Sequence, residues 1–258
     1  MTDSSRERGD ARAVFGQRAS YYTTSATHTD RCTLDQLLGM AEIGPRQTWL
    51  DVGTGTGHTA LALAERVRSV IGSDITPEML AEAVRLTADR TVTNVSWHLA
   101  DVQALSYRDA AFAGVACRRA AHHFSDIDRA LHEIHRVLKP GGWLLIDDRS
   151  APEDQSVDDI MHQLDRLHDP SHVRQYRLST WRDLLSRGGF ELQSLSTYTQ
   201  HRPIASLTRG VSPSDARRIE QIVASAPEQA RRLMNVERRE GTTYLNHWYL
   251  MLAARKVG

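Results

Sequence analysis

The sequence predicts an α/β fold in which a mostly parallel sheet has helices on both faces. Short apolar segments near residues 48–53, 69–74, 94–99, 113–117 and 143–147 alternate with stretches of helical periodicity. Such alternation is typical of parallel strands joined by crossover helices. A glycine-rich turn follows the first of these strands directly. With 258 residues, the chain is long enough for one such domain with additions.

The turn after the first strand reads Gly53-x-Gly55-x-Gly57 and leads into a helical pattern. Glycine lets a ligand approach the main chain, and a helix that begins here presents unpaired N–H groups to it. Asp74 ends the second apolar segment about twenty residues beyond the first glycine, where such folds place the carboxylate that binds a ribose. These features predict a nucleotide-type cofactor site.

Asp51, two residues before the first glycine, helps to choose between cofactors. The glycine spacing differs from the G-x-G-x-x-G fingerprint of nicotinamide and flavin dinucleotides. An acidic residue at this position favours a cationic ligand, such as the α-amino group and sulfonium of S-adenosylmethionine (SAM), over a pyrophosphate. The alternative is that Asp51 only accepts hydrogen bonds from amides of the turn.

Helix signals follow the second and fourth strands. Thr76 before Pro77 predicts an N-cap and a first-turn proline. A helix over 127–138 is expected to stop at Lys139-Pro140-Gly141-Gly142. Its apolar residues recur at helical spacing on one face and are therefore assigned to the core: Leu131, Ile134, Val137 and Leu138.

The second half of the chain is less regular. Residues 151–170 are acidic, partly helical in pattern, and form the expected specificity region. Residues 179–190 read as a capped helix ended by glycine that leads into a strand at 190–199. Two helices are expected within 203–239, and a strand over 244–255 would close the sheet as its seventh member.

Four segments, taken in order, resemble the class I SAM-dependent methyltransferases. They are residues 50–74, 100–105, 117–124 and 134–142. The resemblance is to the small-molecule type related to the ubiquinone and menaquinone biosynthesis methyltransferases, which carry a methyltransferase type 11 domain. It implies a Rossmann-like seven-stranded sheet, with an N-terminal cap and helical insertions over the active site. One departure is Ala113, where the family usually has a second acid.

The resemblance also implies a set of cofactor-binding residues. They are Asp51, Gly53, Thr54, Gly55, Gly57, Asp74, Ile75, Met79, Ala100, Asp101, Val102 and Arg118. The glycine turn would cradle the methionine moiety of SAM, Asp74 would hold the ribose hydroxyls, and Ile75 would pack on adenine. Asp101 would accept a hydrogen bond from the adenine amino group, and residues 118–123 would line the methyl end.

His122 and His123 are the candidate catalytic bases. They follow the fourth strand at the carboxyl edge of the sheet, where ligands of such folds bind, and histidine accepts protons near neutral pH. Adjacent side chains on a turn seldom face the same way, so at most one is expected to meet substrate. The alternative for each is structural packing or contact with the cofactor. Tyr21, Tyr22 and His28 are substrate-site candidates, because the family uses this segment as a cap.

The predicted organisation divides the chain into five parts. They are a disordered tail (1–14), N-terminal cap helices (15–45), a SAM-binding core (46–150), core completion with substrate-binding insertions (151–239), and the final strand (240–258).

Composition limits the classes of molecule that the protein is expected to bind. Lys plus Arg equals Asp plus Glu at 32 each, so no net charge recruits nucleic acid or an anionic membrane. No secretory signal or membrane span is visible, which predicts a cytoplasmic protein. No metal site is expected, since the histidines and the two cysteines lack ligand spacing. The expected partner is a small-molecule acceptor, with the oligomeric state open and a homodimer one option.

The predicted function is SAM-dependent methyl transfer to oxygen or carbon of a small organic acceptor by in-line displacement. Two alternatives keep the SAM fold. One is an enzyme that catalyses a non-methylating cyclisation or rearrangement, and the other is a noncatalytic partner subunit. A nicotinamide dehydrogenase is disfavoured by the glycine spacing.

Overall fold

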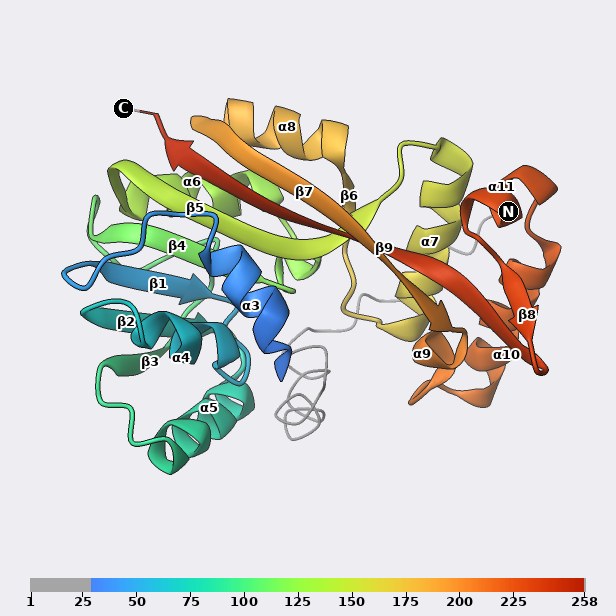
Figure 1. The fold of residues 1–258 in the computed structure, drawn as a ribbon, viewed down its shortest axis with the longest axis horizontal. Coiled ribbons are helices and arrows are strands. Elements are labelled where there is room, and N and C mark those ends of the chain that lie inside the picture. Colours follow the sequence, from blue (N-terminus) through green and yellow to red (C-terminus); the bar gives the residue numbers. More distant parts are fainter. Residues whose placement is uncertain (1–28, 258) are drawn as a thin grey trace.

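A single mixed sheet organises the chain in the computed structural model, which describes residues 29–257. Its main path runs in the order β3-β2-β1-β4-β5-β9-β7 (Figure 1). The strands are β1 (Thr48–Val52), β2 (Ser69–Asp74), β3 (Val95–Leu99), β4 (Phe112–Arg118), β5 (Leu138–Ala151), β7 (Phe190–Pro203) and β9 (Thr242–Lys256). Strands β1 to β5 are parallel, and β9 runs antiparallel between β5 and β7. The predicted α/β class and seven-stranded path are confirmed.

Two short strands extend the sheet beyond that path. Strand β6 (Tyr176–Arg177) pairs with β5, and β8 (Glu237–Arg239) pairs with β9, so the described part of the chain forms nine strands. The pairing of β4 with β5 shifts register between Phe112 and Gly114. This irregularity lies at Ala113, the position where the sequence departs from the family pattern.

Helices cover both faces of the parallel part (Figure 1). Helices α3 (Arg31–Leu38), α4 (His58–Ala64) and α5 (Pro77–Asp89) lie on one side, and α6 (Ile127–Val137) and α8 (Leu178–Arg187) lie on the other. Each face has its own buried apolar cluster, one joining α3 and α4 to the sheet and one joining α6 and α8 to it. The apolar stripe predicted for α6 is buried as expected.

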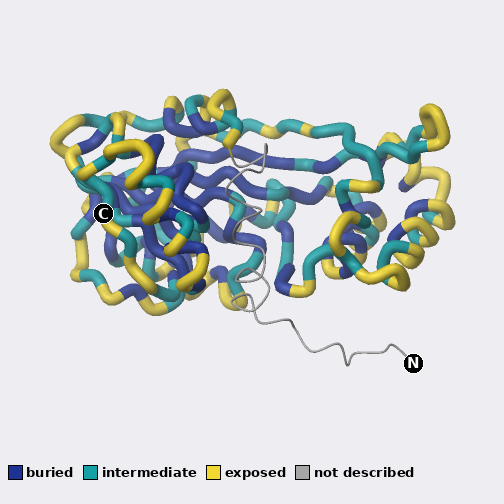
Figure 2. Tube along the Cα trace, turned by 90° about the horizontal axis from the view of Figure 1, so that it is seen from below, coloured by how far each residue is buried: buried dark blue, intermediate teal, exposed yellow. Residues whose placement is uncertain are grey.

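Strands β5, β7 and β9 continue past the parallel strands and carry a second group of helices (Figure 1). These are α7 (Gln155–His168), α9 (Ala205–Thr208), α10 (Pro213–Ser225) and α11 (Glu228–Leu233). A third apolar cluster holds them together. Buried chain is densest in the parallel part of the sheet, while buried and exposed residues alternate along the outer helices (Figure 2). The segment 203–239 holds three helices rather than the predicted two, because the four-residue α9 precedes α10, which starts at Pro213, and α11, which has Pro227 as its N-cap.

Two helix starts differ from expectation in detail. Thr76 occupies the N-cap of α5, yet its hydroxyl makes no capping bond, and its backbone N–H donates to Asp74 Oδ1 at 2.9 Å. Helix α8 begins after Arg177 rather than Ser179. The Ser179 N–H and hydroxyl donate instead to the Glu153 carboxylate at 3.0 and 2.7 Å.

Candidate active site

The glycine turn between β1 and α4 has positive φ at all three glycines, with values of 61°, 53° and 89° for Gly53, Gly55 and Gly57. A Cβ on Gly53 would lie 2.5 Å from Ala120 Cβ, and one on Gly57 would lie 2.4 Å from the Trp97 ring. A Cβ on Gly55 would meet no atom of residues 29–257 within 4 Å. Protein packing therefore requires two of the glycines, while Gly55 faces open space that a ligand can approach.

Asp51 lies fully buried on β1 just before this turn. Its Oδ2 accepts a hydrogen bond from Thr54 Oγ1 at 2.5 Å, whereas its Oδ1 has no hydrogen-bond partner within the described part of the chain. Burial raises the pKa of Asp51 to about 7. A buried acceptor in this state can receive a cationic donor from a ligand.

Asp74 ends β2 and contacts the same turn. Its Oδ2 accepts from the Gly55 N–H at 2.8 Å and its Oδ1 from the Thr76 N–H at 2.9 Å. Burial raises its pKa. The structure thus joins the predicted ribose-binding acid to the predicted methionine-binding turn, because parallel strands β1 and β2 end at the same edge of the sheet.

The remaining predicted cofactor residues surround the ends of β2 and β3. The Ala100 N–H donates to the Asp74 carbonyl at 2.9 Å, and Asp101 Oδ1 accepts from the Gln103 N–H at 2.9 Å. Ile75 is half-buried, while Met79 and Val102 are buried. Of these residues, Ala100 contacts Asp74 directly, and the cofactor roles of the set stay predictions.

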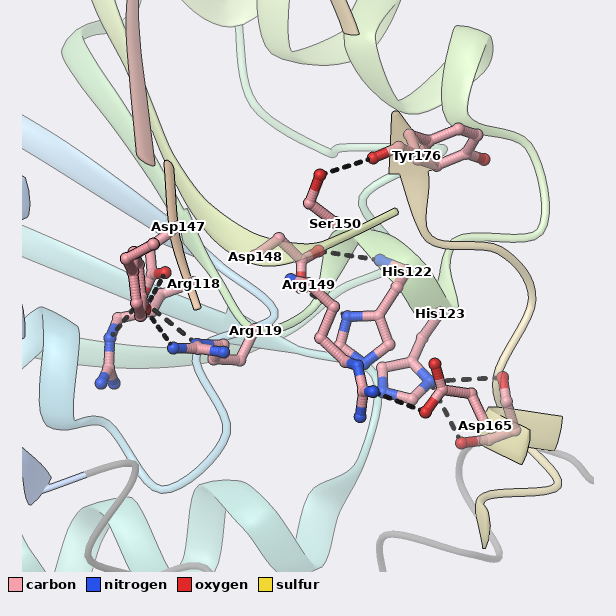
Figure 3. A network of polar contacts seen from close by, with 12 residues as sticks. Arg118, Arg119, His122, His123, Asp147, Asp148, Arg149, Ser150, Asp165 and Tyr176 are labelled. Carbon is pink, nitrogen blue, oxygen red and sulfur yellow. Dashed lines mark hydrogen bonds and ion pairs between the residues drawn. The ribbon is translucent and has the colours of Figure 1, made fainter. Parts of the chain in front are cut away.

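Arg118, at the end of β4, belongs to a buried charged cluster (Figure 3). Its Nε lies 3.2 Å from Asp147 Oδ2, and Arg119 Nε reaches the same oxygen at 3.2 Å. Arg119 also donates to the Tyr198 hydroxyl at 2.5 Å and stacks 4.0 Å from the centre of the Tyr249 ring. The single carboxylate of Asp147 therefore neutralises only part of the charge of two guanidinium groups.

His122 and His123 follow on a short 3-10 turn (Ala121–His123), with their ring centres 3.9 Å apart. Asp148, on β5, binds His122 at two points (Figure 3): its Oδ1 lies 2.5 Å from His122 Nδ1 and its Oδ2 accepts from the His122 N–H at 2.9 Å. His123 Nδ1 instead lies 3.2 Å from both the carbonyl and the hydroxyl oxygen of Ser171. The structure separates the two candidates, since one is held by the sheet and the other by a loop.

Burial holds the pKa of His122 well below its ordinary value, and the neighbouring His123 and Arg149 act in the same direction. Burial also raises the pKa of Asp148 to about 6. At neutral pH the pair is therefore a neutral imidazole beside an ionised carboxylate.

A polar cluster of Arg149, His162, Asp165 and His172 lies beside this histidine pair. Arg149 Nη2 pairs with Asp165 Oδ1 at 2.6 Å, and the His172 ring centre lies 5.6 Å from that of His122 and 5.5 Å from that of His162. Five buried atoms of the cluster have no hydrogen bond within the described residues: Arg149 Nε, His162 Nδ1, Asp165 Oδ1, Asp165 Oδ2 and His172 Nε2. Of these, Asp165 Oδ1 is the ion-pair partner of Arg149. Burial, followed by the charge of His122, lowers the pKa of His172.

Sequence reasoning missed this polar cluster and also Asp148. A signal for Asp148 was present, because Asp147 and Asp148 follow an apolar run at the carboxyl end of the fifth strand, beside the strand that leads to His122. No local pattern marks His172, which lies on a loop after α7. The predicted substrate residues Tyr21, Tyr22 and His28 lie outside the described residues.

Neither a metal site nor a membrane-spanning helix is found within residues 29–257. Over this range, no group of three or more His, Cys, Asp or Glu side chains is close enough to hold a metal ion. Over the same range, no helix is both long and apolar enough to cross a membrane.

Comparison with known proteins identifies the family. Residues 50–146 match the family model described as a methyltransferase domain. An uncharacterized methyltransferase of Bacillus subtilis, YcgJ, is 36% identical over 202 residues, which are 78% of this chain and 80% of the relative. This chain is a methyltransferase.

Its structure agrees with that assignment. The crystal structure of YcgJ superposes with a TM-score of 0.84 at 31% identity, covering 88% of this chain and 99% of that one. A demethylmenaquinone methyltransferase from Thermus thermophilus is 42% identical over 99 residues, which are 38% of this chain and 44% of the relative. The methyltransferase is of class I with SAM as its cofactor, and the comparisons do not favour the non-methylating and noncatalytic alternatives.

The residues of the glycine turn fit this cofactor. The open approach to Gly55 accommodates a ligand against the main chain, and Asp51 Oδ1 offers a buried acceptor for a cationic amino group.

Proposed function

We propose that this methyltransferase transfers a methyl group to oxygen or carbon of a small organic acceptor that lies beside His122 and the polar cluster. The observation that carries the proposal is the position of His122. It is a buried histidine with a lowered pKa, on the short turn that follows β4, the strand that pairs with β1 beside the glycine turn. A neutral imidazole at this edge can accept the proton that an acceptor loses as it is methylated.

The cofactor residues take separate roles in this proposal. Asp51 Oδ1 accepts from the α-amino group, the backbone around Gly55 contacts the methionine moiety, and Asp74 binds the ribose hydroxyls. Asp101 accepts from the adenine amino group. The other members of the predicted set line the same site, with Gly53, Thr54 and Gly57 in the turn, Ile75, Met79, Ala100 and Val102 at adenine, and Arg118 at the methyl end.

When bound, SAM supplies a methyl group on a sulfonium, which is a good electrophile. The protein positions the acceptor in line with that methyl group, which supplies most of the rate enhancement. His122 removes the acceptor proton and contributes about a hundredfold to ten-thousandfold more. His123, held by Ser171, orders the loop beside the acceptor.

The polar cluster favours a methyl-acceptor substrate that carries hydrogen-bonding groups. Asp165 and His172 are almost fully buried and each has a polar atom without a partner in the described part of the chain. Burying such groups costs free energy unless a ligand or water satisfies them. A hydroxylated aromatic or quinol head group fits this requirement, and the demethylmenaquinone methyltransferase among the relatives makes a quinol a sensible probe.

The test is to incubate the purified protein with SAM and either catechol or reduced menadione. S-adenosylhomocysteine and the methylated product are then measured by mass spectrometry, and the product spectrum distinguishes O- from C-methylation. We expect product formation to fall at least about a hundredfold in His122→Gln. The exposed His132→Gln should match the wild type. Product formation that His122→Gln leaves unchanged would refute the base assignment, and conversion of a probe without S-adenosylhomocysteine would favour a non-methylating reaction.

A further inference from the structure

Asp148 lies on β5, one residue past the point where the neighbouring parallel strand β4 ends. Arg118 on β4 pairs with Asp147 on β5, so Asp148 is the next residue along β5, beside the turn that carries His122. Its side chain is 1% exposed. A carboxylate this deeply buried must be satisfied by several donors to remain ionised.

Three donors meet this carboxylate. Oδ2 accepts from the His122 N–H at 2.9 Å, while Oδ1 accepts from the Arg149 N–H at 2.7 Å and lies 2.5 Å from His122 Nδ1. Because an ionised carboxylate only accepts, the His122 Nδ1 atom must carry the proton. Both the main chain and the ring of His122 are therefore fixed by one side chain.

This arrangement leaves His122 Nε2 as the unprotonated ring nitrogen. No hydrogen bond to Nε2 forms among the described residues. Burial and the neighbouring His123 and Arg149 disfavour the imidazolium in the resting protein. A proton taken up at Nε2 would nevertheless be stabilised through the ring by the Asp148 carboxylate, as a buried aspartate does in a catalytic triad.

We infer that Asp148 is a positioning residue that holds His122 in the Nδ1-protonated form, so that His122 Nε2 is the base that accepts the proton of an acceptor hydroxyl. The inference rests on the proposed function. In the reaction, the acceptor oxygen forms its bond to the methyl carbon as the methyl–sulfur bond breaks and its electron pair stays on sulfur. The hydroxyl proton passes to Nε2 and leaves later to solvent.

His123 is poorly suited to the same role. Its Nδ1 lies within 3.2 Å of two oxygens of Ser171, a residue of the loop after α7, and Asp169 at the start of the same loop interacts electrostatically with it. The contact with Ser171 ties His123 to the loop. The two adjacent histidines are thus distinguished by their partners.

The test uses an isosteric variant. In Asp148→Asn, the amide NH₂ must face one of two backbone donors, the His122 N–H or the Arg149 N–H. When it faces the Arg149 N–H it also donates to His122 Nδ1, so the variant admits the Nε2-protonated form that the carboxylate excludes. Asp158→Asn is the matched control, because Asp158, on α7, is also a fully buried carboxylate. It pairs with Arg174 and Arg177, which lie in the segment that follows α7.

Long-range ¹H–¹⁵N NMR of the full-length, histidine-labelled protein reports which ring nitrogen is protonated, and His122→Gln assigns the signal. We expect Nδ1–H alone for His122 in the wild type and in Asp158→Asn, and a measurable share of Nε2–H in Asp148→Asn. An Nε2–H form in the wild type, or the same form in both wild type and Asp148→Asn, would overturn the inference.

Kinetics give an independent readout with whichever probe is methylated. We expect kcat of Asp148→Asn to fall about a hundredfold, with an unchanged Kd for SAM. The loss should shrink for 4-nitrocatechol, whose hydroxyl ionises without a base near neutral pH. An equal loss with both catechols would assign Asp148 a purely structural role. The NMR result stands whether or not methyl transfer occurs, so failure of the proposed function and failure of this inference are distinguishable.

Discussion

Thr54 donates its hydroxyl to Asp51 at 2.5 Å, and this bond leaves the second oxygen of the buried Asp51 carboxylate without a partner within the described residues. The bond also limits the upward shift that burial imposes on the pKa of Asp51. The free oxygen lies just before the glycine turn, which makes it the natural acceptor for a ligand ammonium group.

SAM binding should therefore weaken as the pH falls. Burial raises the pKa of Asp51 to about 7. Below this pH, Asp51 must lose a proton before it can pair with the ammonium group, so Kd rises toward about tenfold for each pH unit. Above about pH 8 the ligand amino group loses its own proton and affinity falls again. Calorimetric titrations from pH 5.5 to 8.5 measure this profile.

Two variants test whether Asp51 causes the loss of SAM affinity below about pH 7, which is the acidic limb of that profile. Asp51→Asn should lower the affinity at pH 7.5 by about tenfold to a hundredfold and remove the acidic limb. Thr54→Val should move the limb to higher pH, since the Thr54 hydrogen bond lowers the pKa of Asp51. A limb that persists in Asp51→Asn would assign the titration to another group.

Gly57 should matter for folding through Trp97. An alanine at Gly57 would place its Cβ 2.4 Å from the Trp97 ring and would hold φ near 89°. We expect Gly57→Ala to lower the free energy of unfolding by about 2 to 4 kcal/mol. Chemical denaturation measures the loss. In a Trp97→Leu background the same change should cost less, and an equal cost in both backgrounds would show that the ring is not the obstacle.

Asp74 should discriminate ligands by their ribose. The wild type is expected to bind 5′-methylthioadenosine about tenfold to a hundredfold more tightly than its 2′-deoxy form, because ionised acceptors bind hydroxyls strongly. Asp74→Asn should lose most of this preference. Asp74→Ala is less informative, since it also removes the acceptor of the Gly55 and Thr76 N–H groups and destabilises the turn. A ribose preference retained in Asp74→Asn would exclude the proposed contact.

The sequence predicted best those site residues that lie within one short segment of the chain. Asp51, the three glycines and Asp74 form one strand–turn–helix–strand unit, and the structure brings Asp74 against Gly55 as that unit requires. The parallel strands were predictable from their apolar segments, although β5 runs further, from Leu138 to Ala151.

Contacts between residues that are far apart in the sequence could not be predicted from local spacing. The contact between His122 and Asp148 depends on the pairing of β4 with β5, and the contact between Arg149 and Asp165 depends on how α7 folds back on β5. Neither pair is close in sequence, and the outer helices carry an apolar cluster of their own. Local periodicity indicates such helices without indicating which polar groups they enclose.

The most direct test of the account is a calorimetric titration with SAM of the wild type and of Gly55→Ala, after removal of any nucleotide carried through purification. A Cβ on Gly55 would meet no atom of the described residues within 4 Å, so the variant should fold with a loss of only about 1 to 2 kcal/mol. The account predicts one-to-one binding to the wild type and a large loss of affinity in Gly55→Ala. Failure of the wild type to bind SAM, or unchanged binding by a folded Gly55→Ala, would contradict it.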